Sequence, residues 1–246
     1  VRGQHADYDH WAAQGNPGWG WEDVKPYFLR SENNERINDA WHGQGGPLNV
    51  ADLRAPNRFS SLFAQAGVQA GHPHNSDFNG ATQEGVGIYQ VTHQNGERHS
   101  AAKGYLTPHL DRPNLQVVTG AHATRVVFDG QRAVGVEYWQ GGALNKVRAT
   151  REVLLSAGAL LSPQLLMLSG VGPGAQLQQH GIPVLHDLPG VGAHLHDHPD
   201  VVQVMEAPDV KDLFGLSLSG MAQMARGVMQ WRKNRTGILP TNFAEA

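Results

Sequence analysis

The stretch Gly158–Gly172, GALLSPQLLMLSGVG, gives the clearest indication of how this chain folds. It overlaps residues 152–159, EVLLSAGA, a run of apolar and small residues that is typical of a fully buried strand. Ser162 and Pro163 are typical of a helix N-cap and first helical position, and Gly170 is placed to end that helix. The order of residues therefore predicts a buried strand, a turn of small residues and a helix.

The segments on either side predict a mixture of helices and short strands. Four segments have helical periodicity or helix caps: 21–28, 56–70, 100–110 and 216–232. Six β-rich runs stand between them or near them: 115–118, three runs within 124–149, 182–188 and 201–207. Asp129-Gly130 and Gln140-Gly141-Gly142 separate the runs within 115–149 as turns, so we expect a small antiparallel meander there. The fold class expected is a mixed α/β (α+β) fold.

Composition limits the classes of protein that need to be considered. Hydrophobic residues make up 40% of the chain and charged residues 17%, as in globular proteins, and the net charge of -3 without a basic block gives no reason to expect a nucleic-acid partner. The absence of cysteine excludes disulfides and thiolate metal sites. We find no apolar run near the ~20 residues of a membrane span and no signal peptide, so we expect no transmembrane segment. The location expected is cytoplasmic, either free or associated with a membrane.

Residues 170–175, GVGPGA, satisfy the dinucleotide-binding pattern G-x-G-x-x-G/A, and Asp187 stands near the place of a ribose-binding acid. That motif requires a strand before the glycines and a full helix after them. Here a helix is expected before them, and only residues 176–180 are available for the helix that follows. An NAD-dependent dehydrogenase that uses Gly170 to Asp187 is therefore an alternative, and a loop that ends a helix is the preferred interpretation.

Two other clusters are interpreted as structural. The alternating histidines of 194–198, HLHDH, are of a residue type that binds zinc, copper and iron, but Gly192 and Pro199 indicate a loop, so no metal site is expected. The methionines at 221, 224 and 229 have near-helical spacing and are expected in a core or an interface.

The chain resembles the glucose–methanol–choline oxidoreductases over nearly its whole length. Gly158–Gly172 resembles a signature of this family: a small pair, Ser-Pro, two aliphatics and then Ser-Gly-aliphatic-Gly. Four other stretches are similar to family segments in the same order: 1–32, 42–50, 95–138 and 190–199. Within the last of them, His194 stands where the family usually has Asn. The most similar members are of the choline dehydrogenase and alcohol dehydrogenase type.

The resemblance implies an FAD-dependent oxidoreductase. Its substrate would be a small-molecule alcohol, such as choline or another primary alcohol, which is oxidised to an aldehyde by hydride transfer to the flavin. It implies an incomplete FAD-binding domain with the β-meander, over 95–200, and parts of an antiparallel-sheet substrate domain, over 1–94 and 201–246. It leaves the electron acceptor and the oligomeric state open. A second hypothesis is that the isolated chain is a catalytically inert module.

The resemblance also implies site residues. The backbone of Ala123 would meet the adenine of FAD, and Ala157 and Gly158 would pass close to its ADP half. We expect the family's G-x-G-x-x-G motif before the first residue of the chain and its catalytic histidine after the last, so no catalytic residue is expected within it.

Asn242 and Glu245 are candidate substrate contacts, because an acidic side chain there would favour a cationic alcohol. The alternative for Glu245 is an ordinary surface carboxylate.

Overall fold

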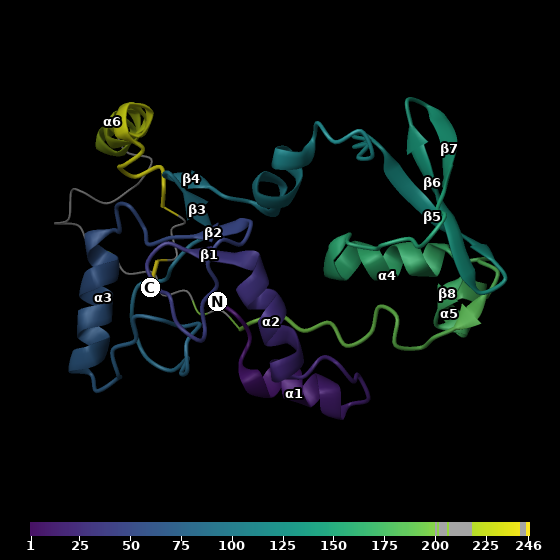
Figure 1. The fold of residues 1–246 in the computed structure, drawn as a ribbon, viewed down its shortest axis with the longest axis horizontal. Coiled ribbons are helices and arrows are strands. Elements are labelled where there is room, and N and C mark those ends of the chain that lie inside the picture. The colour runs from purple at the N-terminus through teal and green to yellow at the C-terminus, as the bar shows by residue number, and fades with distance from the viewer. Residues whose placement is uncertain (200, 202–205, 207–217, 242–244) are drawn as a thin grey trace. The chain divides into compact units, whose positions relative to one another are not determined.

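The computed structural model describes residues 1–199, 201, 206, 218–241 and 245–246. They belong to two compact units, Val1–Leu115 with Glu206–Ala246, and Gln116–Met205. Both units contain helices and short strands, which confirms the mixed α/β class (Figure 1). The domain limits 1–94, 95–200 and 201–246 stay a prediction, since compactness does not show which residues bind a ligand.

The first unit opens with two helices, α1 (His5–Ala13) and α2 (Trp21–Ser31). The helical spacing in 21–28 predicted α2, whose start is fixed by the Asp23 carboxylate, which accepts a hydrogen bond from the Gly20 N–H at 3.1 Å. The sequence did not predict α1. Each residue of α1 is exposed or half-buried, so this helix lacks the apolar stripe by which periodicity is recognised.

Two small strand pairs follow in the same unit. Strands β1 (Glu32–Asn34) and β2 (Leu48–Val50) are parallel. Strands β3 (His93–Gln94) and β4 (Glu97–Arg98) form an antiparallel hairpin. The hairpin turns at Asn95 and Gly96, which have φ values of +53° and +72°. Two successive positive φ values are typical of a type I′ turn, so this turn is the one that an Asn-Gly pair predicts.

The remaining helices of the first unit agree in place with the expected ones. The helix α3 (Arg58–Gln69) confirms the prediction for 56–70, and the Asn57 side chain caps it by accepting from the Phe59 N–H. The segment 100–110 is helical but contains a π-helical turn, η1 (Ala102–Leu106), and a 3₁₀ turn, η2 (Thr107–His109). The helix α6 (Leu218–Asn234) confirms the described part of the helix expected over 216–232.

The core alternative is wrong for two of the methionines in α6, and the interface alternative stays a prediction. The exposed fractions of Met221 and Met229 are 54% and 62%, so both side chains lie on the outer face of the helix. The face that packs inward instead carries the buried residues Gly220 and Gly227.

The second unit contains the predicted meander: β5 (His122–Asp129), β6 (Arg132–Gln140) and β7 (Ala143–Arg148), paired antiparallel in that order. Gly130 has a φ of +56° in the first turn, and Gly141 and Gly142 have +60° and +80° in the second. The expected strand over 115–118 is not formed. These four residues are exposed and pair with no strand among the described residues.

The helix α4 (Gly158–Leu168) packs against β5 (Figure 1). It begins at Gly158, so the predicted N-cap at Ser162 is wrong, and Pro163 lies inside the helix. The predicted strand over 152–159 is also wrong: residues 152–157 belong to no strand, and Leu154 is 78% exposed. A strand requires a neighbour for its backbone groups, and the described residues offer none here.

The end of the second unit is built from short elements. Gly170 has a φ of +87° and ends α4 as predicted. The strand β8 (Val171–Gly172) pairs in parallel with β9 (His186–Asp187), so only two residues of the strand expected over 182–188 are in a ladder. Between them lies the helix α5 (Gly174–Gln179). Most of the strand expected over 201–207 lies outside the described residues.

Within the described part of the chain, no helix combines the length and the apolar composition that crossing a bilayer requires.

Candidate functional site

The start of α4 carries two of the three predicted cofactor residues, Ala157 and Gly158. Ala157 is the N-cap, and its N–H donates to the Ser162 Oγ at 3.1 Å. Gly158 has a φ of +84°, a conformation that glycine adopts at low cost, and a Cβ built on it would meet no atom within 4 Å. Both residues are exposed. The backbone at this point is therefore open to close approach by a ligand.

The third predicted cofactor residue, Ala123, lies in the same unit. It is exposed on β5, opposite Tyr138 of β6, and the register of the two strands shifts just after it. A hydrogen bond joins β5 to the end of α4, because the Val126 N–H donates to the Ser169 Oγ at 2.8 Å. The Ser169 hydroxyl in turn donates to the Leu165 carbonyl at 2.5 Å. Ala123, Ala157 and Gly158 thus lie on two elements that pack together.

The start of α4 fits a flat, nucleotide-like cofactor in two respects. No side chain caps the first N–H groups of the helix, which leaves donors for an anionic group. Leu154, Leu160 and Leu161 are 78%, 69% and 58% exposed, so apolar surface adjoins those donors. Apolar walls with a few placed donors are typical of cofactor sites.

The glycine-rich segment 170–175 does not form a dinucleotide-binding turn. It follows the helix α4, and the helix after it, α5, has only 6 residues. Asp187, the candidate ribose acid, accepts a hydrogen bond from the Gly174 N–H at 2.8 Å and so occupies the start of α5. Both observations agree with the interpretation that these glycines end one helix and connect it to the next element.

Glu245 is not a surface carboxylate, since it is only 2% exposed. Its Oε2 accepts from the Asn57 N–H at 2.6 Å and from the Ser60 hydroxyl at 3.0 Å, and its Oε1 accepts from the Thr241 hydroxyl. The carboxylate therefore lies at the N-terminus of α3, where a negative charge is favourable. These contacts indicate that Glu245 joins the chain end to α3. Asn242 lies outside the described residues.

The histidine-rich loop 194–198 contains no strand, and His194 has a φ of +57°. Among the residues that the structure describes, no group of three or more histidine, aspartate or glutamate side chains is arranged to hold a metal ion.

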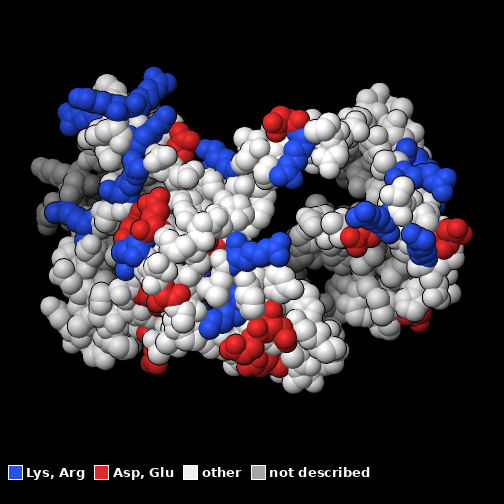
Figure 2. Space-filling model, in the orientation of Figure 1, with Lys and Arg blue, Asp and Glu red and all other residues white. Residues whose placement is uncertain are grey.

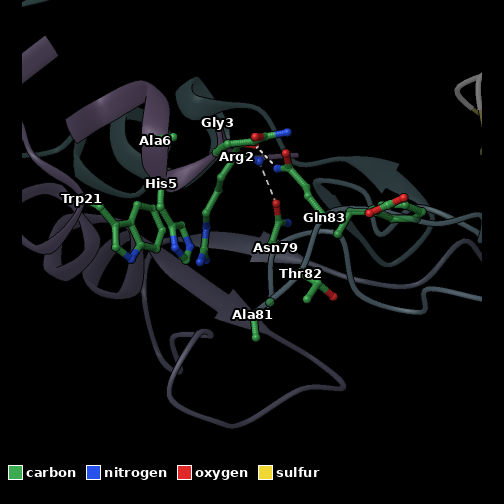
Figure 3. Close-up of a pocket in the computed structure, with 13 residues that line it drawn as sticks. Arg2, Gly3, His5, Ala6, Trp21, Asn79, Ala81, Thr82 and Gln83 are labelled. Carbon is green, nitrogen blue, oxygen red and sulfur yellow. Dashed lines mark hydrogen bonds between the residues drawn. The ribbon is translucent and has the colours of Figure 1, made fainter. Parts of the chain in front are cut away.

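The sequence did not predict a cavity of about 400 Å³ in the first unit (Figure 3). Arg2, His5 and Trp21 line one side of it, and residues 78–84 line another. The Arg2 N–H donates to the Asn79 Oδ1 at 2.7 Å, and the Gln83 amide donates to the Arg2 carbonyl at 2.6 Å, as Figure 3 shows. Residues far apart in the sequence form this cavity, so no local pattern marks it.

A buried polar network continues from Arg2. Its guanidinium donates to the Glu32 Oε2 at 2.7 Å, and Glu32 is 4% exposed. The Nδ1 atom of His42 lies 3.3 Å from the Glu32 Oε1, and its Nε2 lies 3.0 Å from the Asp77 Oδ2. Asn34 contacts both Glu32 and His42. The network connects segments 1–6, 32–42 and 77–83, so it fixes the wall of the cavity.

The pKa values that clearly depart from the ordinary ones belong to groups outside these sites. Burial, and secondly the positive charge of Arg54, lower the pKa of His93. Hydrogen bonding to Arg125 lowers the pKa of the Glu137 carboxyl, and hydrogen bonding to Lys103 lowers that of Glu97. These carboxylates belong to exposed ion pairs, and none of the groups is positioned as a catalytic acid or base in either candidate site.

Comparison with known proteins connects these elements to a family. Residues 1–200 match the GMC oxidoreductase family. The whole chain is 44% identical to an alcohol dehydrogenase [acceptor] of Pseudomonas putida and 43% identical to an oxygen-dependent choline dehydrogenase of Brucella anthropi. It covers 45% and 44% of those two proteins, so the chain spans under half the length of the curated relatives it matches.

The fold is similar to that of a solved enzyme. An FAD-dependent oxidoreductase from Chaetomium thermophilum superposes with a TM-score of 0.84 and 28% sequence identity, over 98% of this chain and 44% of that protein. The family and this neighbour are FAD-dependent. The alternative of an NAD-dependent dehydrogenase is therefore not supported.

Proposed function

Because the chain belongs to the GMC oxidoreductase family, we propose that it is part of an FAD-dependent enzyme that oxidises a small alcohol. The observation that carries this proposal is the family match over residues 1–200. The open space beside the backbone of Gly158, where a cofactor could approach, supports it. The bound flavin would accept a hydride from the alcohol carbon, which yields an aldehyde from a primary alcohol. A cytoplasmic location, free or at a membrane surface, is part of the proposal.

The proposed roles of the described residues concern binding. Ala157 and Gly158 would let the ADP half of FAD approach the chain, because neither carries a large side chain and both are exposed. The backbone of Ala123 would contact the adenine. The proton-accepting histidine of the reaction is proposed to lie outside these 246 residues.

Choline is one candidate substrate, and uncharged primary alcohols are the other. The relative from Brucella anthropi is called a choline dehydrogenase, and Glu245 supplies a carboxylate that would attract a quaternary ammonium group. Since three hydrogen-bond donors already hold that carboxylate, it would act on choline through its charge and not through a free oxygen. Asn242 is kept as a second proposed substrate contact.

The test uses the full-length protein that contains this chain. It should purify with a flavin absorbance spectrum, and anaerobic addition of choline or of an uncharged primary alcohol should bleach that spectrum. A neutral isostere of choline distinguishes recognition of charge from recognition of shape. Purification without flavin, after an attempt at reconstitution with FAD, would contradict the proposal. Bleaching by neither kind of alcohol would contradict the substrate class alone.

A further inference from the structure

Among the residues that the structure describes, the contacts of α6 with its unit gather on one face of the helix. Gly227 is buried, and a Cβ built on it would lie 2.5 Å from the Cγ2 of Ile238, so the helix approaches that segment as closely as glycine allows. The Trp231 Nε1–H donates to the Gly96 carbonyl at 2.9 Å. Gly220 is buried on the same side. These contacts determine which face of α6 points outward.

The outward face carries an apolar stripe. Leu218, Met221 and Met229 are 84%, 54% and 62% exposed, and Ala222 and Ala225 between them are also exposed. Counted from Leu218, these residues stand at i, i+3, i+4, i+7 and i+11, which places them on one side of a helix. An apolar stripe of this length on a helix that is otherwise well attached indicates a contact surface.

Positive charge flanks the stripe. The 17 residues of α6 include no aspartate or glutamate. Arg226, Arg232 and Lys233 are exposed, and no ion pair to them is found within the described part of the chain. Figure 2 shows basic side chains gathered over α6 at the upper left. Arg235, just beyond the helix, does have partners: its guanidinium forms an ion pair with Glu97 at 3.2 Å and lies over the Trp231 ring.

We infer that the outward face of α6 binds the surface of a membrane that contains anionic lipids. The stripe of leucine, methionine and alanine would enter the interface, and the arginine and lysine side chains would contact lipid phosphates. The helix is about 25 Å long at 1.5 Å per residue and would lie parallel to the surface. Its lack of acidic residues disfavours a basic partner, and its continuous apolar stripe favours a lipid interface over a purely polar protein contact.

This inference deepens the proposed location of the protein and is independent of its redox chemistry. A failure to bind vesicles would leave the flavin assay unaffected, and an absence of flavin would leave the vesicle assay interpretable. The two proposals are therefore tested separately.

The experiment is co-sedimentation of the full-length protein with phosphatidylcholine vesicles and with vesicles that also contain phosphatidylglycerol. We expect binding to the anionic vesicles, weaker binding at high salt, and little binding to the neutral ones. The variant R226E/R232E/K233E should lower the partition coefficient roughly a hundredfold or more, since each basic residue near an anionic surface contributes roughly a fivefold effect. The variant L218S/M229S should lower binding at every salt concentration.

A matched variant controls for net charge. R112E/R148E/R151E makes the same change of charge at exposed positions that do not belong to α6, and it should bind the anionic vesicles nearly as well as the wild type. Flavin content or the unfolding temperature would verify that each variant is folded. The inference is overturned if the wild type fails to bind anionic vesicles, if it binds neutral vesicles equally well, or if the two triple variants bind alike. Capture of an acidic protein without vesicle binding would also overturn it.

Discussion

The Nε2 atom of His42 lies 3.0 Å from the Oδ2 atom of Asp77, and the imidazole is completely buried. On its other side the same ring faces Glu32, which also receives the Arg2 guanidinium. A single buried imidazole therefore connects two carboxylates that are 45 positions apart in the chain (77 minus 32). Because removing one member of such a network leaves the others buried without a partner, its members should be sensitive to substitution.

We predict that Glu32→Gln destabilises the full-length protein by about 3–5 kcal/mol, as expected when a buried ion pair loses one partner. The side chains of Arg2 and Glu32 are only 10% and 5% exposed, so water cannot replace the lost interaction. The measurement is the free energy of unfolding from urea denaturation. Asp52→Asn is the matched control, because its pair with Arg36 is exposed and should be worth at most about 1 kcal/mol. Equal losses in both variants would contradict the network's role.

A second prediction concerns the contact between β5 and α4. Ser169→Ala should destabilise the protein by about 1–3 kcal/mol, because the N–H of Val126, a residue only 3% exposed, would lose its acceptor. Ser156→Ala is the control, since Ser156 is exposed and precedes α4. The measurement is again the free energy of unfolding. A loss for Ser169→Ala no larger than that for Ser156→Ala would show that water satisfies the Val126 N–H.

Local patterns in the sequence predicted the elements whose stability is local. The helix α3 and the meander β5–β7 have apolar periodicity and turn residues that agree with one another, and both are present. The helix α1 was not predicted because it buries no residue fully. Residues 152–157 were predicted as a strand from composition, but a strand also needs a neighbouring strand, and composition carries no information about that.

The candidate sites also differ in whether a local sequence pattern could predict them. Ala157 and Gly158 were assigned to the cofactor site from the family resemblance and their small side chains, and this assignment stays a prediction. The sequence did not predict the environment of Glu245, because the donors Asn57 and Ser60 are more than 180 positions away from it. The network around His42 was missed for the same reason. Hydrogen bonds between distant segments leave no periodic signal, so they emerge only when the fold is known.

A third prediction tests the proposed contact between Gly158 and FAD. Gly158→Val in the full-length protein should raise the dissociation constant for FAD at least about tenfold, or about 1.4 kcal/mol, because the new side chain would occupy the space beside the backbone. Gly181→Val is a close control. The φ of Gly181 is +68° and that of Gly158 is +84°, and a Cβ built on either residue would meet no atom within 4 Å. Both variants place a valine at a positive φ, where a side chain is strained. Equal FAD affinity in the two would remove Gly158 from the site.

A fourth prediction concerns the isolated chain of 246 residues. We expect it to bind FAD weakly or not at all, because residues 152–157, which lead into the proposed site, pair with no strand among the described residues and Leu154 is 78% exposed. Titration of flavin fluorescence would measure the affinity, with the full-length protein as reference. Binding by the isolated chain as tight as by the full-length protein would show that the described elements form a complete FAD site.

The last prediction concerns pH and follows from His93. Burial, and then the charge of Arg54, lower its pKa below the ordinary 6.5, and its Nδ1 is buried with no hydrogen-bond partner among the described residues. As the pH falls through about 6.5, the unfolded chain binds a proton at this residue before the folded protein does, so the free energy of unfolding decreases. The contribution of His93 is fully present above that pH. His93→Asn should therefore reduce the loss of stability between neutral and mildly acidic pH, measured by urea denaturation at several pH values. His180→Asn, a substitution of an exposed histidine, is the control variant. A profile that His93→Asn leaves unaltered would contradict this account.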